Sequence, residues 1–132
     1  MARNPPLYET GMKIRREVLG DTYVDAATRT ADQGPLPAAL QELVAQYCWG
    51  EVWSRPGLDR RSRSLLNLGM LAALNRPHEL KLHVRGALNN GLTRDEIGEA
   101  FLQAAIYCGV PAALDSFRVA REVFREIDES TP

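Results

Sequence analysis

Long apolar runs, paired cysteines and an excess of charge of one sign are all absent from this sequence of 132 residues. Without an apolar run of about 20 residues we expect no membrane-spanning helix, and the N-terminus lacks the apolar core of a secretory signal. We therefore expect a cytoplasmic protein. The formal net charge of −1 disfavours a general nucleic-acid binder, which carries a strong basic excess. The two cysteines, Cys48 and Cys108, form no CxxC, so a thiol redox motif and a zinc-ligand spacing are both absent.

Alternating strand patterns are also absent, and every strong periodicity is helical, so the expected fold class is all-α. Gly, Pro and capping residues divide the chain into about six helices, over residues 5–19, 37–53, 59–74, 77–90, 93–108 and 111–127. One or two weak helical turns are expected within 21–34, and the tail from Asp128 is expected to fray. The length fits one domain over residues 1–132, with an N-terminal helical arm (1–34) and core helices (35–128).

His83 is the first candidate for chemistry. Leu80, Val84 and Ala87 surround it at helical spacing and draw its ring toward the apolar side of the helix. Burial beside charges shifts a histidine pKa within the physiological range, which suits a proton donor. A core histidine bonded to a neighbouring carbonyl explains the same spacing, and spacing alone favours that second interpretation.

Arginines gather where the buried helix from Asp59 is expected to begin. Arg60, Arg61 and Arg63 lie in its first turn, where unpaired backbone N–H groups already favour anions, and Arg85 lies on the following helix. Guanidinium groups bind carboxylates in a two-pronged manner, so the group predicts a carboxylate site. A solvated helix start, or ion pairs between subunits, remains the alternative.

Both tryptophans of the chain stand just before this turn, with one glutamate between them. Trp49 and Trp53 are four residues apart and share one helical face, where they form either the wall of an apolar pocket or part of a core. Glu51 is a candidate to orient a histidine, or else a partner for an arginine.

Three strings resemble the carboxymuconolactone decarboxylase family: "YETGMKIRREVLGDTYVD", "YCWGEVWSRPGLDRRSRSLLNLGMLAALNRPHELKLHVRGALNNGLT" and "EIGEAFLQAAIYCGVPAA". The resemblance extends from Tyr8 to about Val123. It implies an all-helical subunit of the kind found in alkyl hydroperoxidase D-like proteins. It also implies assembly into a ring-like homo-oligomer, a hexamer built as a trimer of dimers or a trimer.

Redox members of that superfamily are similar around "HVRGALNNG" but carry a CxxC just before the histidine. Arg76 and Glu79 occupy the corresponding positions here, so the sulfurs required for thiol peroxidase chemistry are missing. The fold alone permits either function, and the site residues decide between them.

The resemblance implies conversion of 4-carboxymuconolactone to 3-oxoadipate enol-lactone and CO₂ in protocatechuate catabolism, without a metal or organic cofactor. The lactone itself accepts the electron pair. A protonated His83 is the expected proton donor and Glu51 its orienting partner. The expected substrate-binding residues are Arg60, Arg61, Arg63, Arg85, Trp49 and Trp53. Two alternatives stay open: a thiol redox protein using Cys48 or Cys108, and a helical ligand-binding oligomer without catalysis.

Overall fold

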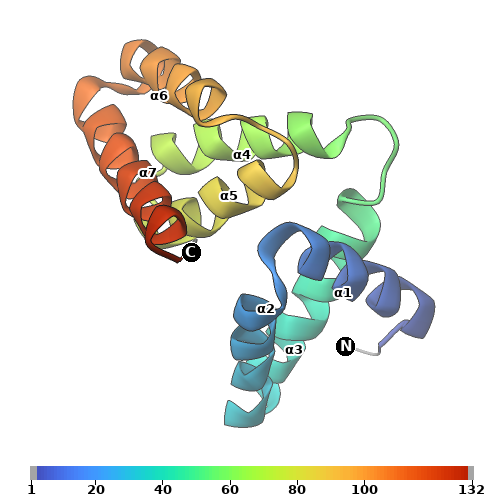
Figure 1. The fold of residues 1–132 in the computed structure, drawn as a ribbon. Coiled ribbons are helices and arrows are strands. Elements are labelled where there is room, and N and C mark those ends of the chain that lie inside the picture. The colour runs from blue at the N-terminus through green and yellow to red at the C-terminus, as the bar shows by residue number, and fades with distance from the viewer. Residues whose placement is uncertain (1–2, 131–132) are drawn as a thin grey trace. The chain divides into compact units, whose positions relative to one another are not determined.

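The computed structural model describes residues 3–130, and these form helices joined by short turns (Figure 1). Within that range no strand occurs, which confirms the all-α prediction. The α-helices are α1 (Pro5–Leu19), α2 (Asp21–Thr28), α3 (Pro35–Leu43), α4 (Arg60–Ala73), α5 (Pro77–Asn89), α6 (Arg94–Cys108) and α7 (Val110–Ser130). A 3₁₀-helix, η1 (Arg29–Gln33), follows α2, and a π-helix, η2 (Val44–Val52), follows α3.

Helices α1 and α6 begin close to the predicted positions, residues 5 and 93, and both are capped. Asn4 accepts a hydrogen bond from the backbone N–H of Leu7 at the start of α1, and Gly20, with φ of 88°, ends that helix. At the start of α6 the Thr93 hydroxyl accepts from the Glu96 N–H, while the Glu96 carboxylate accepts from the Thr93 N–H. This reciprocal pair is the capping box expected from "TRDE".

Three segments differ from the prediction. Residues 21–33 are helical throughout rather than for one or two turns. The helix from α3 continues to Val52, but as a π-helix. Asp128–Ser130 belong to α7, so the prediction of a frayed tail was wrong for these residues, and the last two residues lie outside the described range.

The helices group into two compact units that divide between Asp59 and Arg60. The N-terminal unit thus includes α3 and η2 as well as the expected arm. The prediction of one domain over residues 1–132 is not tested by this grouping and stays a prediction.

In the N-terminal unit α1 packs closely against η2. A Cβ on Gly11 would overlap with the carbonyl oxygen of Ala45 and would lie 2.8 Å from the backbone nitrogen of Gly50. A Cβ on Gly50 would in turn meet the Leu7 carbonyl oxygen. Only residues without a side chain allow the two backbones to approach this closely, and the contact fixes η2 against α1.

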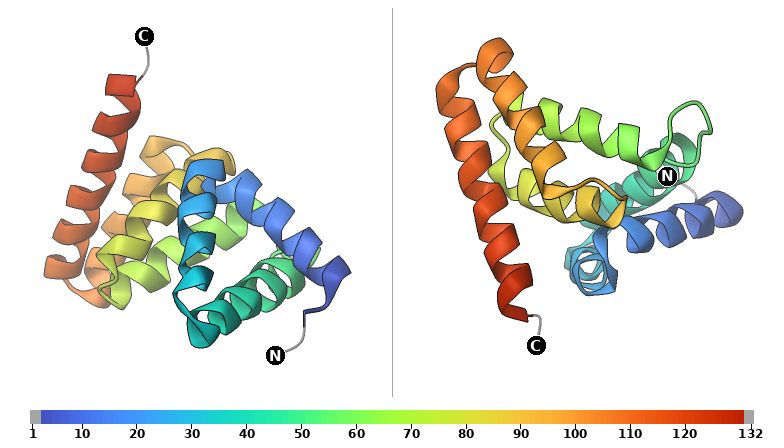
Figure 2. Two further views of the ribbon diagram at one scale, coloured as in Figure 1. Left: turned by 90° about the horizontal axis from the view of Figure 1, so that it is seen from below. Right: turned by 45° about the horizontal axis from the view of Figure 1, so that its top comes forward.

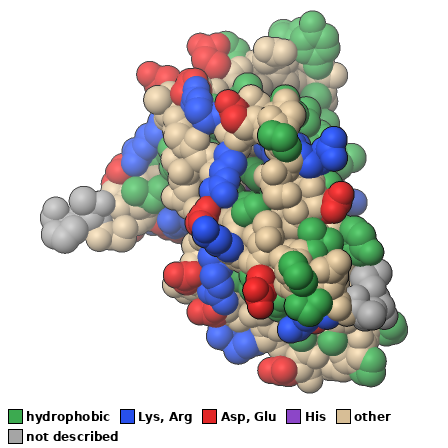
Figure 3. Space-filling model, turned by 90° about the vertical axis from the view of Figure 1, so that its right-hand side faces the viewer, with side chains coloured by type: hydrophobic (Ala, Val, Ile, Leu, Met, Phe, Trp, Pro, Cys, Tyr) green, Lys and Arg blue, Asp and Glu red, His purple; other side chains and the backbone are tan. Residues whose placement is uncertain are grey.

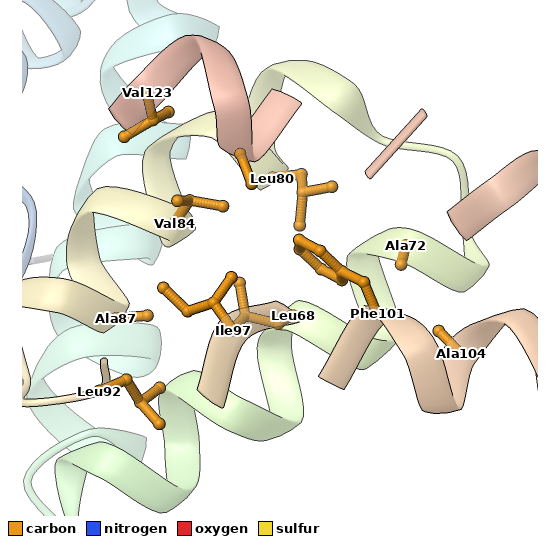
Figure 4. Packing of buried hydrophobic residues seen from close by; sticks show 11 residues of the cluster. Leu68, Ala72, Leu80, Val84, Ala87, Leu92, Ile97, Phe101, Ala104 and Val123 are labelled. Atoms are coloured by element: carbon orange, nitrogen blue, oxygen red, sulfur yellow. The ribbon is translucent and has the colours of Figure 1, made fainter. Parts of the chain in front are cut away.

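In the C-terminal unit α7, the longest helix, packs against α4, α5 and α6 (Figures 1 and 2). The side chains of Leu68, Val84, Ile97 and Phe101 converge between these helices and are fully buried (Figure 4). They come from α4, α5 and α6, so this core fixes the positions of the polar side chains on the same three helices.

Not all apolar residues are buried. Leu65, Leu66 and Met70 of α4 are about half exposed, so the prediction of a helix buried nearly all round was wrong for this face. Hydrophobic side chains also lie among basic and acidic ones on the face shown in Figure 3. Among the described helices, none has the length and hydropathy that crossing a bilayer requires.

Replacement of Gly11 by alanine tests the contact between α1 and η2. Because the added methyl group overlaps with backbone, we expect the free energy of unfolding to fall by about 1–3 kcal/mol. Urea denaturation followed by tryptophan fluorescence measures this change, since both tryptophans lie in the N-terminal unit.

Gly69→Ala is the matched control, because a Cβ at Gly69 within α4 meets no atom within 4 Å. There we expect a gain of about 0.5–1 kcal/mol from the better helix propensity of alanine, measured by circular dichroism because both tryptophans lie in the other unit. A Gly11→Ala protein as stable as the unmodified chain would show that the helices do not need this close approach.

Candidate active site

His83 is held at a fixed position on α5 by the core of the C-terminal unit. Leu80, Val84 and Ala87, on the same side of α5, are buried in that core, and the His83 ring itself is partly buried. Desolvation by this burial lowers the pKa of His83 from its ordinary 6.5 to about 4. The ring is therefore neutral at pH 7 in the unliganded chain, and the expectation of a protonated ring does not hold in that state.

Asn67 of α4 is a polar neighbour of this ring, with its Nδ2 3.4 Å from Nδ1 of His83. An amide nitrogen can only donate, so with the amide in this orientation Nδ1 is the acceptor and the proton of the neutral ring lies on Nε2. Sequence reasoning did not select Asn67, because the contact joins two helices and residue spacing carries no signal for it.

Arg61 and Arg85 are bound to carboxylates of the C-terminal unit itself. Arg61 donates from Nη2 to Glu96 at 2.6 Å and from Nη1 to the Gly91 carbonyl at 2.9 Å. Arg85 donates to Glu126 at 2.8 Å, and Glu126 also accepts from Lys81 at 2.8 Å. These pairs join α4 to α6 and α5 to α7.

Arg60 and Arg63 occupy the first turn of α4 and are partly buried. In that turn Asn90 donates to the hydroxyl of Ser64 at 2.8 Å and to the carbonyl of Arg60 at 3.5 Å, which ties the end of α5 to the start of α4. The structure thus places all four candidate arginines in the same unit as His83, while their contacts with a substrate stay a prediction.

The tryptophans belong to the N-terminal unit. Trp49 and Trp53 are buried and stacked, with ring centroids 4.7 Å apart, and they form an apolar cluster with Ile14 and Val18. In this unit they act as core residues, one of the two roles that their spacing allowed. Glu51, between them, is exposed on η2, and its proposed role toward His83 stays a prediction.

The cysteines give no support to a thiol mechanism. Both are free thiols. Desolvation raises the pKa of the Cys48 thiol more than the nearby charge of Arg15 lowers it, so Cys48 is a poorer nucleophile than an ordinary cysteine. Within residues 3–130 no group of three His, Cys, Asp or Glu side chains is arranged to hold a metal ion.

Comparisons with known proteins agree with the resemblance seen in the sequence. Residues 38–122 match the model of the carboxymuconolactone decarboxylase family. A protein of Metarhizium robertsii named nitrosuccinic acid decarboxylase is 46% identical over 121 residues, which cover 92% of this chain and 83% of that protein. The 4-carboxymuconolactone decarboxylase of Acinetobacter baylyi is 39% identical over 120 residues, which cover 91% of this chain and 88% of that protein.

The state of His83 is directly measurable by ¹⁵N NMR of its ring nitrogens. We expect a neutral ring with the proton on Nε2 from pH 7 down to about pH 4, because protonation would place a charge in a desolvated site. A His78→Gln variant assigns the signals, since the chain has two histidines and His78 is the exposed one.

The same shift predicts a pH dependence of stability. Since the folded pKa lies below the ordinary 6.5, the unfolded chain binds more protons between about pH 6.5 and pH 4, and stability falls as the pH is lowered through that window. A His83→Gln variant should lose this part of the dependence. Protonation of His83 near pH 6.5 would contradict its desolvation.

Proposed function

The chain belongs to the carboxymuconolactone decarboxylase family and is a decarboxylase, and we propose that it removes one carboxyl group from a small dicarboxylate carrying an electron-accepting substituent. The observation that carries this proposal is the similarity, over more than 90% of the chain, to two proteins that are both named as decarboxylases. Their named substrates differ, but both are dicarboxylic acids.

The two substrates share one chemical requirement. In 4-carboxymuconolactone the bond to the ring carboxylate breaks, and its electron pair passes through the conjugated C=C bond to the lactone carbonyl. In nitrosuccinic acid the electron pair passes to the nitro group on the carbon that carried the departing carboxylate. Each reaction releases CO₂, leaves an oxygen-centred anion and ends with protonation at carbon. No external electron acceptor is needed, which supports a mechanism without an organic cofactor.

We propose 4-carboxymuconolactone as the substrate and 3-oxoadipate enol-lactone as the product, in protocatechuate catabolism. The motif "WGEVWSRPGLDRRSRS" and the match to the bacterial enzyme support this choice. Nitrosuccinic acid is the second candidate, favoured by the 46% identity to the fungal enzyme.

In this proposal His83 stabilises the oxyanion and then supplies the proton. Its Nε2–H is suited to donate a hydrogen bond to the oxygen on which negative charge develops. Binding of a dianion raises the pKa of a nearby imidazole, so substrate binding favours uptake of a proton that the ring then gives to carbon. The ring takes up this proton at Nδ1, so the Asn67 amide must then turn its oxygen toward that nitrogen, and Glu51 remains the proposed second partner of the ring.

Four arginines of the C-terminal unit form the proposed carboxylate-binding group: Arg60, Arg61, Arg63 and Arg85. Arg61 is already paired with Glu96 and Arg85 with Glu126, so a substrate carboxylate must compete with these partners. Trp49 and Trp53 are proposed to exclude water from the substrate. A leaving carboxylate in an apolar environment is destabilised relative to neutral CO₂.

We also propose that the protein functions as a homo-oligomer. Large apolar residues at the end of α6 and the start of α7 are more than half exposed: Leu102, Ile106, Tyr107, Val110 and Leu114. An exposed apolar surface of this kind is typical of a contact between copies of a chain.

The direct test is an ultraviolet assay of the purified protein with freshly prepared 4-carboxymuconolactone and, in parallel, with nitrosuccinic acid. We expect turnover of the lactone, unchanged by a chelator, because the lactone accepts the electron pair without a metal. Turnover of nitrosuccinic acid alone would move the protein to the second candidate function. Turnover of neither would contradict the proposal.

Replacement of His83 by glutamine tests the proton donor. We expect kcat to fall by about 10²- to 10⁴-fold, with a much smaller change in KM, because the variant keeps a hydrogen-bond donor but cannot supply the proton. His78→Gln is the matched control and should keep normal kinetics. A near-normal kcat for His83→Gln, with unchanged helicity by circular dichroism, would make His83 a core residue.

A further inference from the structure

Arg15 of α1 is a charged side chain buried in the N-terminal unit, with only 4% of its surface exposed. Its neighbour Arg16 lies at the surface and pairs with Asp21 and Asp25 at 3.0 and 2.8 Å. A guanidinium group cannot lose its proton in a protein, so burial of Arg15 is not relieved by a change of charge. An uncompensated buried charge destabilises a protein by several kcal/mol.

The contacts of Arg15 do not compensate this charge. Within residues 3–130 it forms one hydrogen bond, from Nη1 to the neutral side chain of Gln41 at 3.0 Å, and no ion pair. Its Nε is buried without a hydrogen-bond partner. Native proteins rarely leave a buried donor unsatisfied, and here the unsatisfied donor belongs to a cation.

The nearby thiol does not serve as the counter-ion. A thiolate at Cys48 would neutralise Arg15, but desolvation outweighs the effect of Arg15 and raises the pKa of that thiol. Cys48 therefore stays neutral at pH 7, where an ordinary cysteine is already mostly protonated.

The surroundings of Arg15 would strengthen its attraction for an anion. Ile14 and Val18, on the same helix, pack with Trp49 and Trp53 in an apolar cluster. Ion pairs and charged hydrogen bonds are stronger where water is excluded. A carboxylate, with two oxygens in one plane, matches the Nε–H and Nη–H edge of a guanidinium group.

We propose that Arg15 binds a carboxylate group of a small dicarboxylate ligand. This site lies in the N-terminal unit and goes beyond the proposed function, which rests on residues of the C-terminal unit. Because Nε is buried in the unliganded chain, binding is accompanied by a local rearrangement of the N-terminal unit, which holds both tryptophans.

The test measures binding of succinate, an unreactive dicarboxylate, to the intact chain by calorimetry and by tryptophan fluorescence, with butyrate as the monocarboxylate reference. We expect succinate to bind more tightly than butyrate and to change the fluorescence. Arg15→Met should weaken succinate binding by about 10- to 100-fold, the effect of losing a charged hydrogen bond. Arg16→Met, the matched control, should stay within about twofold of the unmodified chain, because Arg16 is already paired at the surface.

The stability of the variants separates ligand binding from a structural role. Without ligand, Arg15→Met should be at least as stable as the unmodified chain, because it removes an uncompensated charge and keeps the length of the side chain. Arg15→Lys keeps the charge but loses the two-pronged geometry of the guanidinium group, so it should bind succinate with intermediate affinity. If Arg15→Met fails to fold, Arg15→Lys still tests the proposal.

Three outcomes would overturn the assignment: no measurable succinate binding by the unmodified chain, normal succinate affinity in Arg15→Met and Arg15→Lys, or a change of oligomeric state alone in these variants. Binding that depends on Arg15, in a protein that decarboxylates neither candidate substrate, would support the carboxylate site and contradict the proposed function. Decarboxylation by a chain whose succinate binding does not depend on Arg15 would support the proposed function and contradict this carboxylate site.

Discussion

Two side chains that carry or can take up a positive charge are withdrawn from water in this chain, one in each unit. In the C-terminal unit the buried face of α5 holds His83 in an environment that lowers its pKa to about 4 and keeps it neutral. In the N-terminal unit Arg15 is buried but keeps its charge, because a guanidinium group does not deprotonate. In each unit burial thus prepares one side chain for a negatively charged partner: a nearby anion raises the pKa of a buried imidazole, and it pairs with a buried guanidinium group.

Much of the fold could be predicted from the sequence, because its signals are local. Asn4 and Gly20 mark the ends of α1, and the capping box of Thr93 and Glu96 marks the start of α6. The π-helix η2 could not be predicted, since its apolar residues follow ordinary α-helical spacing. Its close packing against α1 at Gly11 is a tertiary contact that local spacing does not encode.

The candidate site was only partly accessible to sequence reasoning. Spacing selected His83 but gave no sign of Asn67, which reaches the ring from another helix. The cluster of arginines was visible, but the carboxylates that pair with Arg61 and Arg85 come from α6 and α7 and depend on the packed structure. Arg15 was missed because two adjacent arginines in an amphipathic helix normally indicate a solvated face, and only the packing against η2 shows which one is buried.

The central claim is that the chain releases CO₂ from a dicarboxylate and returns one proton from solvent to carbon. Proton NMR of the reaction with 4-carboxymuconolactone in D₂O, combined with measurement of released CO₂, tests it most directly. The account predicts one CO₂ for each lactone consumed and an enol-lactone product with a single deuterium at one carbon. Consumption of the lactone without CO₂, or recovery of unchanged lactone and unchanged nitrosuccinic acid, would contradict it.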